Sequence, residues 1–233
     1  MTEPAAADLP AYIVSDLHLG DDHARVPLFR RFLQALPPAA TLVLNGDTID
    51  APSRPLPPAH AEALAAIYAA TADRRVIWIH GNHDDDFQQP PDSGVEVTHT
   101  WTLGDRLMVT HGHAFERSMD RHRWFLTAFQ FMHSLRQRLG AQPIHVAQLA
   151  KKLKPLYGYL CREQRINAVR FAREQGYPAI ACGHVHLSED SIVDGIRYLN
   201  TGCWTEPDTQ CLVCLPDRLL LTPVETLLAD WEQ

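Results

Sequence analysis

The sequence lacks the features that mark membrane-spanning, secreted and disulfide-stabilised proteins. No stretch approaches the roughly 18 consecutive apolar residues of a membrane-spanning helix. The opening, "MTEPAAADLPAY", has no basic region followed by an apolar core, and we therefore expect no signal peptide. The five cysteines are an odd number without the spacing of a disulfide framework, which favours a reducing cytoplasm. Cys211 and Cys214 have the spacing of half a zinc site, but no second pair follows them.

The composition is that of a globular protein with an uneven distribution of charge. Hydrophobic residues make up 45% of the 233 residues and charged residues 21%, which fits a single domain over residues 1–233. The net charge is −7, yet residues 117–173 contain twelve basic and two acidic residues, so this segment carries +10 and the rest −17. Such a block favours an anionic partner, such as phosphate, nucleic acid or an anionic membrane surface. A solvated set of helices is the alternative.

The order of the apolar segments predicts an α/β fold. Five short β-rich runs each end in polar residues: "AYIVSDLH", "TLVLNGD", "RVIWIHGNHD", "RLMVTHGH" and "AIACGHVH". Helix-like stretches over residues 26–36 and 59–72 separate the first three runs. Three further pieces read as hairpins: "VEVTHTWTL", "SIVDGIRYLN", and "TQCLVCLP" with "RLLLTP". We therefore expect an α/β sandwich of two mixed sheets flanked by helices.

Residues 117–175 interrupt this alternation and predict a helical insertion within the domain. Trp124 and Phe131 fall on one helical face, and a second apolar face includes Phe125 and Phe129. A helix that is apolar on more than one face is either wedged between two bodies or offers an apolar surface.

Residues that bind metals follow each of the five β-rich runs. They are Asp16 and His18, then Asp47, then Asn82, His83 and Asp84, then His111, and finally His184 and His186. The carboxyl ends of parallel strands meet at one edge of a sheet, where α/β proteins place their sites. Burying so many carboxylates and imidazoles without a cation is costly. Mixed imidazole, carboxylate and amide ligands suit Mn, Fe, Zn or Co better than Mg or Ca.

The order Asp-x-His, Gly-Asp, Gly-Asn-His-Asp, His and Gly-His-x-His resembles the calcineurin-like metallophosphoesterases across almost the whole chain. The resemblance implies two divalent metal ions, with Mn²⁺ expected first. One ion would be held by Asp16, His18, Asp47 and His186, and the other by Asp47, Asn82, His111 and His184. The resemblance also implies that His83 stabilises the phosphate or protonates the leaving oxygen, and that Asp84 orients its neighbours.

A narrower resemblance points to the UDP-2,3-diacylglucosamine pyrophosphohydrolases. It rests on "SDLHLG", on the helical insertion after "HG", and on "CGHVH" paired with "YLNTGCW". It implies cleavage of a lipid A precursor to lipid X and UMP, in the cytoplasm and in peripheral contact with the inner membrane. The insertion would then cap the acyl chains. The candidate substrate contacts are His113, Trp124, Phe131, Arg121, Arg123, Lys151, Lys152 and Lys154.

Three positions depart from the narrower pattern. His83 stands where the best-studied lipid enzymes have arginine, while His113 and Cys203 stand where the relatives usually have aspartate. These departures bear on the identity of the substrate more than on the metal ligands. The main alternative is a nucleotide or cyclic-nucleotide phosphodiesterase of the same family.

A nuclease is less favoured because the net charge of −7 opposes nucleic-acid binding, so no nucleic-acid partner is expected. A non-catalytic metal-bound scaffold is less favoured too, because no ligand is missing. No oligomeric state is predicted.

Overall fold

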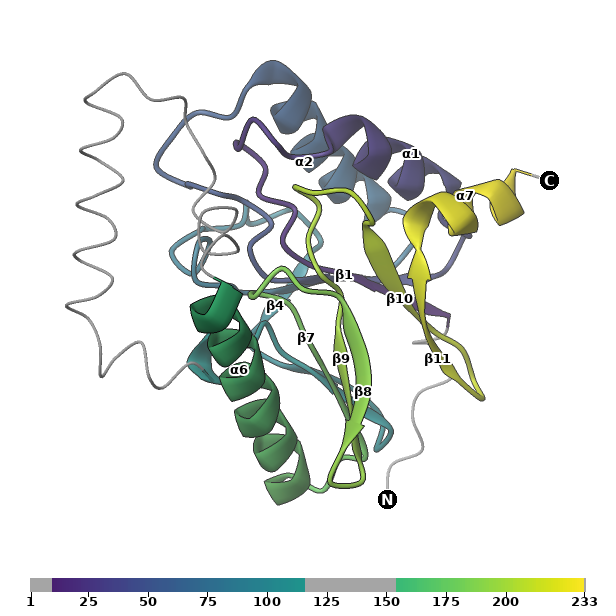
Figure 1. Cartoon of the computed structure of the whole chain (residues 1–233). Coiled ribbons are helices and arrows are strands. Elements are labelled where there is room, and N and C mark those ends of the chain that lie inside the picture. The colour runs from purple at the N-terminus through teal and green to yellow at the C-terminus, as the bar shows by residue number, and fades with distance from the viewer. Residues whose placement is uncertain (1–9, 116–153, 233) are drawn as a thin grey trace, which may run out of the picture.

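The computed structural model describes residues 10–115 and 154–232. Two mixed β-sheets pack face to face, with α1, α2 and α7 over one outer side and α6 over the other (Figure 1). The first sheet has the strand order β11-β10-β1-β2-β3-β4 and the second the order β5-β6-β7-β9-β8. This arrangement confirms the predicted α/β sandwich.

The first sheet and the helices that cover it come from both ends of the described chain. Its strands are β1 (Ala11–Val14), β2 (Thr41–Asn45), β3 (Val76–Ile79), β4 (Glu96–Thr98), β10 (Gln210–Cys214) and β11 (Leu219–Pro223). The covering helices are α1 (Val26–Ala35), α2 (Pro58–Ala70) and α7 (Val224–Trp231). The predicted helices over residues 26–36 and 59–72 therefore begin and end within two residues of α1 and α2.

The second sheet is formed by the middle of the chain. Its strands are β5 (Trp101–Leu103), β6 (Leu107–Val109), β7 (Ala179–Cys182), β8 (Glu189–Val193) and β9 (Ile196–Asn200). A short 3-10 helix, η2 (His113–Phe115), follows β6, and α6 (Lys154–Glu174) precedes β7. Ala168, Val169 and Ala172 of α6 pack against the outer face of this sheet.

The central strands are mainly apolar, as expected of strands that are buried on both faces. In β1, Tyr12 and Val14 point to the helices α1, α2 and α7, while Ala11 and Ile13 point to the second sheet. The alternation is that of an extended strand, in which successive side chains point to opposite faces. It also separates Cys211, in the core under the helices, from Cys214, in the core between the sheets. The two thiols of "CLVC" therefore do not share a face on which they could hold a metal together.

The hairpin predictions are right in two cases and wrong in one. β8 pairs antiparallel with β9, and β10 pairs antiparallel with β11. The piece "VEVTHTWTL" is not a hairpin, because β4 pairs parallel with β3 in the first sheet while β5 pairs with β6 in the second. The reason is burial: Trp101 and Leu103 are buried in the core between the sheets, whereas β4 is a largely exposed edge strand.

Only part of the predicted insertion is described by the structure. Residues 154–174 of the insertion form α6, which lies against the second sheet (Figure 1). Lys154 opens this helix, and the other basic and aromatic candidates of the segment lie outside the described residues: Arg121, Arg123, Trp124, Phe125, Phe129, Phe131, Lys151 and Lys152. The limits of the domain and of the insertion stay predictions. Within the two described ranges, no helix is long and apolar enough to cross a membrane.

Candidate metal centre

The loops that follow β1, β2, β3, β6 and β7 converge on one site. In the first sheet β1, β2 and β3 are parallel neighbours, and in the second sheet β6 and β7 are parallel neighbours. Backbone hydrogen bonds join neighbouring loops, from Asp16 N–H to the Gly46 carbonyl (3.0 Å) and from Gly183 N–H to the His111 carbonyl (2.9 Å). The strand order therefore gathers side chains that lie far apart in the sequence.

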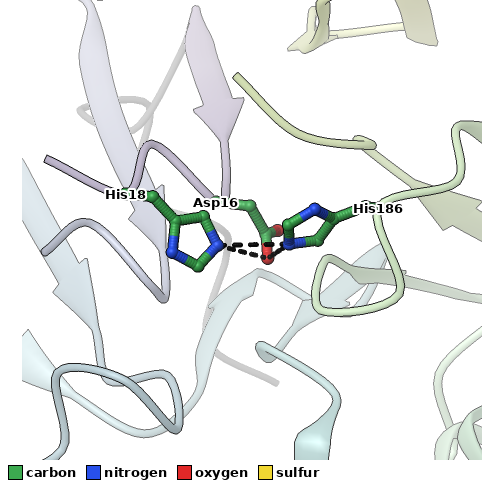
Figure 2. A group of neighbouring side chains, drawn as sticks. All are labelled: Asp16, His18 and His186. Carbon is green, nitrogen blue, oxygen red and sulfur yellow. Dashed lines mark hydrogen bonds and ion pairs between the residues drawn. The ribbon is translucent and has the colours of Figure 1, made fainter. Parts of the chain in front are cut away.

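A first cluster contains Asp16, His18 and His186, whose side chains point toward one another (Figure 2). His186 Nε2 lies 3.2 Å from Asp16 Oδ1 and 3.1 Å from His18 Nε2. His18 Nε2 lies 3.9 Å from the same carboxylate oxygen. All three residues are buried, and their nearest ligand atoms lie within 4.8 Å of one another.

A second cluster contains Asp47, His111 and His184. His111 Nε2 lies 3.2 Å from Asp47 Oδ2, and the same oxygen lies 3.9 Å from His18 Nε2 of the first cluster. Asp47 therefore stands between the two clusters. Asn82 lies in the exposed bend that follows β3, next to His83.

The hydrogen bonds of the imidazoles show that this site fits a cation. The Asn45 carbonyl oxygen can only accept, so His111 Nδ1, 2.8 Å away, donates its hydrogen to it. In the neutral ring, His111 Nε2 then carries a lone pair, which is buried without a hydrogen-bond partner among the described residues and faces the Asp47 carboxylate. Two acceptors that face each other are stable only with a proton or a metal ion between them, so the pair can hold a metal ion in place of a proton. Imidazole and carboxylate ligands of this kind suit a divalent transition metal.

The charges in the site are strongly coupled. Burial raises the pKa of Asp16, but His111 and His186 outweigh it and lower the pKa to about 2. The pKa of Asp47 is likewise well below its usual value, because nearby histidines, His111 first, outweigh its burial. Burial lowers the pKa values of His111 and His186, but the buried aspartates raise each to about 10. The site therefore attracts positive charge, for which protons and metal ions compete.

The ligand-type residues adopt an uncommon backbone conformation. Five of them have a positive φ: Asp16 (55°), His18 (48°), Asp47 (51°), His184 (70°) and His186 (55°). Left-handed backbone is uncommon outside glycine, although aspartate and histidine adopt it more readily than most residues. β1 ends at Val14, so Asp16 and His18 lie beyond the strand, and their side chains are brought together by left-handed backbone rather than by an extended strand. Strained conformations of this kind concentrate at functional sites.

Two glycines of the sequence motifs lie directly against ligand side chains. A methyl group at Gly183 would come within 2.3 Å of Asp16 Oδ2, and one at Gly81 within 2.1 Å of Asp47 Oδ1. Any larger residue would displace the carboxylate. The glycine before Asn82 and the glycine before His184 are therefore required by close packing in the site.

Asp84 and His83 lie beside Asp47. The buried Asp84 carboxylate accepts hydrogen bonds from Gly81 N–H (2.7 Å) and Thr48 N–H (2.8 Å), which ties the loops after β2 and β3 together. Burial raises its pKa. His83 donates its backbone N–H to Asp47 Oδ1 (2.8 Å), while its side chain is 38% exposed. Burial lowers the pKa of His83, but the hydrogen bond to Asp50 and the charge of Asp47 outweigh it and raise the pKa to about 9.

Asp50 is a residue that the sequence analysis missed. Its Oδ1 lies 3.2 Å from His18 Nδ1 and 3.3 Å from His83 Nδ1, and its backbone carbonyl oxygen lies 2.9 Å from His83 Nδ1. These hydrogen bonds hold its pKa well below the usual value. The available signal was the second aspartate of "GDTID", three residues after Asp47. By accepting from His18 Nδ1, Asp50 leaves His18 Nε2 directed at the first cluster.

His113 and Cys203 lie next to the clusters. The His113 ring centroid is 5.6 Å from that of His111 and 6.2 Å from that of His184. Burial, and then the charges of these two histidines, lower the pKa of His113 to about 4. Cys203 groups with His186 and Glu206, so it lies behind a ligand of the first cluster.

The fold and the site define a metal-binding α/β protein, and the family follows from the sequence comparison. Residues 9–188 match the family model described as calcineurin-like phosphoesterase. Since this match covers most of the chain, the chain belongs to that family and is a metal-dependent hydrolase of phosphoesters. The broader of the two resemblances is thereby confirmed, while the narrower one, to the lipid A enzymes, stays a prediction.

Several solved structures are similar to this chain. Yfce, a phosphoesterase from E. coli, has 16% identity and a TM-score of 0.48, with 94% of each chain covered. A Vps29 single mutant from Entamoeba histolytica has 15% identity and a TM-score of 0.47, with 91% of this chain and 90% of that chain covered. The nuclease MPE from Pseudomonas putida has 16% identity and a TM-score of 0.42, with 91% and 87% covered. Structural similarity with TM-scores below 0.5 does not indicate which activity this chain has. No curated protein matches the chain.

Proposed function

We propose that the protein is a two-metal phosphohydrolase that cleaves a phosphodiester or pyrophosphate bond. The observation that carries this proposal is the position of Asp47, whose Oδ2 lies 3.2 Å from a histidine of one cluster and 3.9 Å from a histidine of the other. A carboxylate shared by two ions would keep them close enough to engage one phosphate together. Asp16, His18, Asp47 and His186 would hold the first ion, and Asp47, Asn82, His111 and His184 the second.

When bound, two divalent ions supply Lewis acidity and activate water for attack on phosphorus. The residues of the chain supply the remaining chemistry. His83 is anchored through Nδ1 to Asp50, which leaves Nε2 available, and its partly exposed ring can be reached by a substrate. Burial lowers the pKa of His83, but its hydrogen bond to Asp50 outweighs this and favours the protonated ring, as a group that binds a phosphate oxygen or protonates the leaving oxygen requires. Asp84 holds the loop that carries His83 and Asn82.

The finer proposal is that the substrate is UDP-2,3-diacylglucosamine, cleaved with Mn²⁺ by a cytoplasmic protein in peripheral contact with the inner membrane. Its support is the sequence resemblance in "SDLHLG" and "YLNTGCW" and the basic segment over residues 117–173. A specific observation favours the alternative of a small soluble diester, such as a nucleotide: the residue after Asn82 is the partly exposed His83 rather than arginine.

The test is hydrolysis of UDP-2,3-diacylglucosamine in detergent beside bis-p-nitrophenyl phosphate, both with Mn²⁺. Asp47→Ala removes the proposed shared carboxylate, and Asp73→Ala serves as the matched control, because the Asp73 side chain is 57% exposed and pairs with the neighbouring Arg74. Rapid cleavage of the lipid that is lost in Asp47→Ala and kept in Asp73→Ala would support the lipid substrate. Cleavage of the aryl diester alone would support a soluble diester. Equal turnover by Asp47→Ala and the wild type would refute the two-metal mechanism.

A further inference from the structure

The loop after β7 carries two candidate ligands in a conformation that needs support. His184 and His186 both have a left-handed backbone, with φ of 70° and 55°. The His184 N–H donates to both carboxylate oxygens of Asp16, at 3.1 and 3.0 Å. A turn of this kind cannot rely on a strand ladder, so its carbonyl groups must find other donors.

Helix α6 provides two of these donors. The Gln164 side chain donates from Nε2 to the Gly183 carbonyl oxygen (3.0 Å), and the Tyr157 hydroxyl donates to the Val185 carbonyl oxygen (2.7 Å). The two carbonyl groups flank His184. Tyr157 and Gln164 are seven residues apart, about two helical turns, and therefore lie on the same face of α6. The helix thus holds the loop at two points.

Gln164 also contacts the loop that carries His111. A methyl group at Gly112, the residue after His111, would come within 2.2 Å of Gln164 Nε2. The Gln164 side chain is fully buried, at 0% exposure. One amide therefore packs behind both histidines of the second cluster, which come from two different strand ends.

Among the hydrogen bonds of the described residues, the second sheet donates to one of the two carbonyl groups that α6 holds, that of Gly183. Asn200, at the end of β9, donates from Nδ2 to the Gly183 carbonyl oxygen (2.8 Å). The Val185 carbonyl, which lies between the two ligand histidines, accepts from Tyr157 of α6. The part of the loop nearest His186 is therefore positioned by the helix.

We propose that Tyr157 and Gln164 are positioning residues that set the metal affinity of the centre through the His184–His186 loop. This inference rests on the proposed two-metal function. It also gives α6, which the sequence analysis placed in the inserted segment, a role in the metal centre itself.

The test compares metal binding by Tyr157→Phe, Gln164→Met and Tyr159→Phe in the full chain. Tyr157→Phe removes one hydroxyl group, and Tyr159→Phe makes the same change two residues away on a side chain that is 54% exposed. Affinity for Mn²⁺ is measured by calorimetry, and the geometry of the centre by the visible absorption spectrum of bound Co²⁺. We expect Tyr157→Phe and Gln164→Met to weaken binding by about 10-fold or more and to alter the spectrum. Tyr159→Phe should match the wild type in both.

Melting of the metal-free variants separates positioning from general stability. If Tyr157→Phe and Gln164→Met melt earlier but bind Mn²⁺ and Co²⁺ as the wild type does, α6 only stabilises the fold and the inference is wrong. If Gln164→Met does not fold, the comparison of Tyr157→Phe with Tyr159→Phe alone decides the test. Absence of metal binding by the wild type would overturn the proposed function and this inference together, whereas unchanged binding by the variants overturns this inference alone.

Discussion

At the scale of single residues, Asp50 shows how a group that need not touch the metal can control the site. Its carboxylate accepts from His18 Nδ1 and His83 Nδ1, at 3.2 and 3.3 Å. Asp50→Asn keeps the size of the side chain but removes its charge and one acceptor oxygen. We expect a loss of about 10–100-fold in turnover or metal affinity, the usual effect of changing a residue behind a ligand. Steady-state kinetics with Mn²⁺ titration would measure it.

The matched control for Asp50→Asn is Asp73→Asn, which makes the same change next to Arg74 at the surface. Asp73→Asn should leave both quantities unchanged. If Asp50→Asn also retained wild-type turnover and affinity, the orientation of His18 and His83 would not depend on the carboxylate.

Gly183 illustrates a second effect at this scale, because its lack of a side chain is what the site needs. A methyl group there would come within 2.3 Å of Asp16 Oδ2. We expect Gly183→Ala to displace the carboxylate and to weaken metal binding by about 10–100-fold. Calorimetric titration with Mn²⁺ would measure the loss, beside circular dichroism to show that the variant is folded.

Gly158→Ala is the control, because no atom of the described residues lies within 4 Å of a methyl group at this helical glycine. Alanine is favoured over glycine inside a helix by up to about 1 kcal/mol, so this variant should be as stable as the wild type or more stable. Equal metal affinity in Gly183→Ala and Gly158→Ala would contradict the packing argument.

At the scale of elements, the sequence predicts best those strands whose residue pattern lies within one short segment. The runs that became β1, β2 and β3 are mainly apolar and end in ligand-type residues, so both the strands and the gathering of these side chains at one edge could be predicted. The separation of β4 from β5 could not, because it depends on which sheet buries Trp101 and Leu103. The contacts of Tyr157 and Gln164 with the loop after β7 were missed for the same reason: they depend on where α6 packs.

Trp204 shows that a residue of a sequence motif can stabilise the packing of a helix rather than take part in catalysis. It follows Cys203 in "YLNTGCW", one basis of the narrower resemblance, but its ring is buried against Phe29 and Phe32 of α1, with centroid distances of 5.4 Å. We expect Trp204→Ala to lower the free energy of unfolding by about 3–5 kcal/mol. Urea denaturation would measure it.

The comparison for Trp204→Ala is Ile192→Ala, on an edge strand where the side chain is 75% exposed. Ile192→Ala should change the free energy of unfolding by less than about 0.5 kcal/mol. A Trp204→Ala variant as stable as Ile192→Ala would mean that the ring contributes little to the core between α1 and the first sheet.

At the scale of the whole molecule, the centre joins the two halves of the sandwich. The first sheet contributes Asp16, His18 and Asp47, and the second contributes His111 and the loop from His184 to His186. The residue types and their order could be recognised in the sequence. Their left-handed turns could not, because these turns follow from hydrogen bonds between loops that are distant in the sequence, such as that from His184 N–H to Asp16.

Because the candidate ligands come from both sheets, we expect metal binding to stabilise the entire fold. An ion that binds only the folded chain adds about 2.7 kcal/mol at a concentration 100 times its Kd. For a protein of this size, we expect Mn²⁺ to raise the melting temperature by roughly 5–10 °C over the EDTA-treated protein. Calorimetric melts with and without the metal would measure the shift. In Asp47→Ala the shift should largely disappear, because both clusters lose their shared carboxylate, whereas Asp73→Ala should keep it. A shift of the same size in Asp47→Ala would place the stabilising ion elsewhere on the molecule.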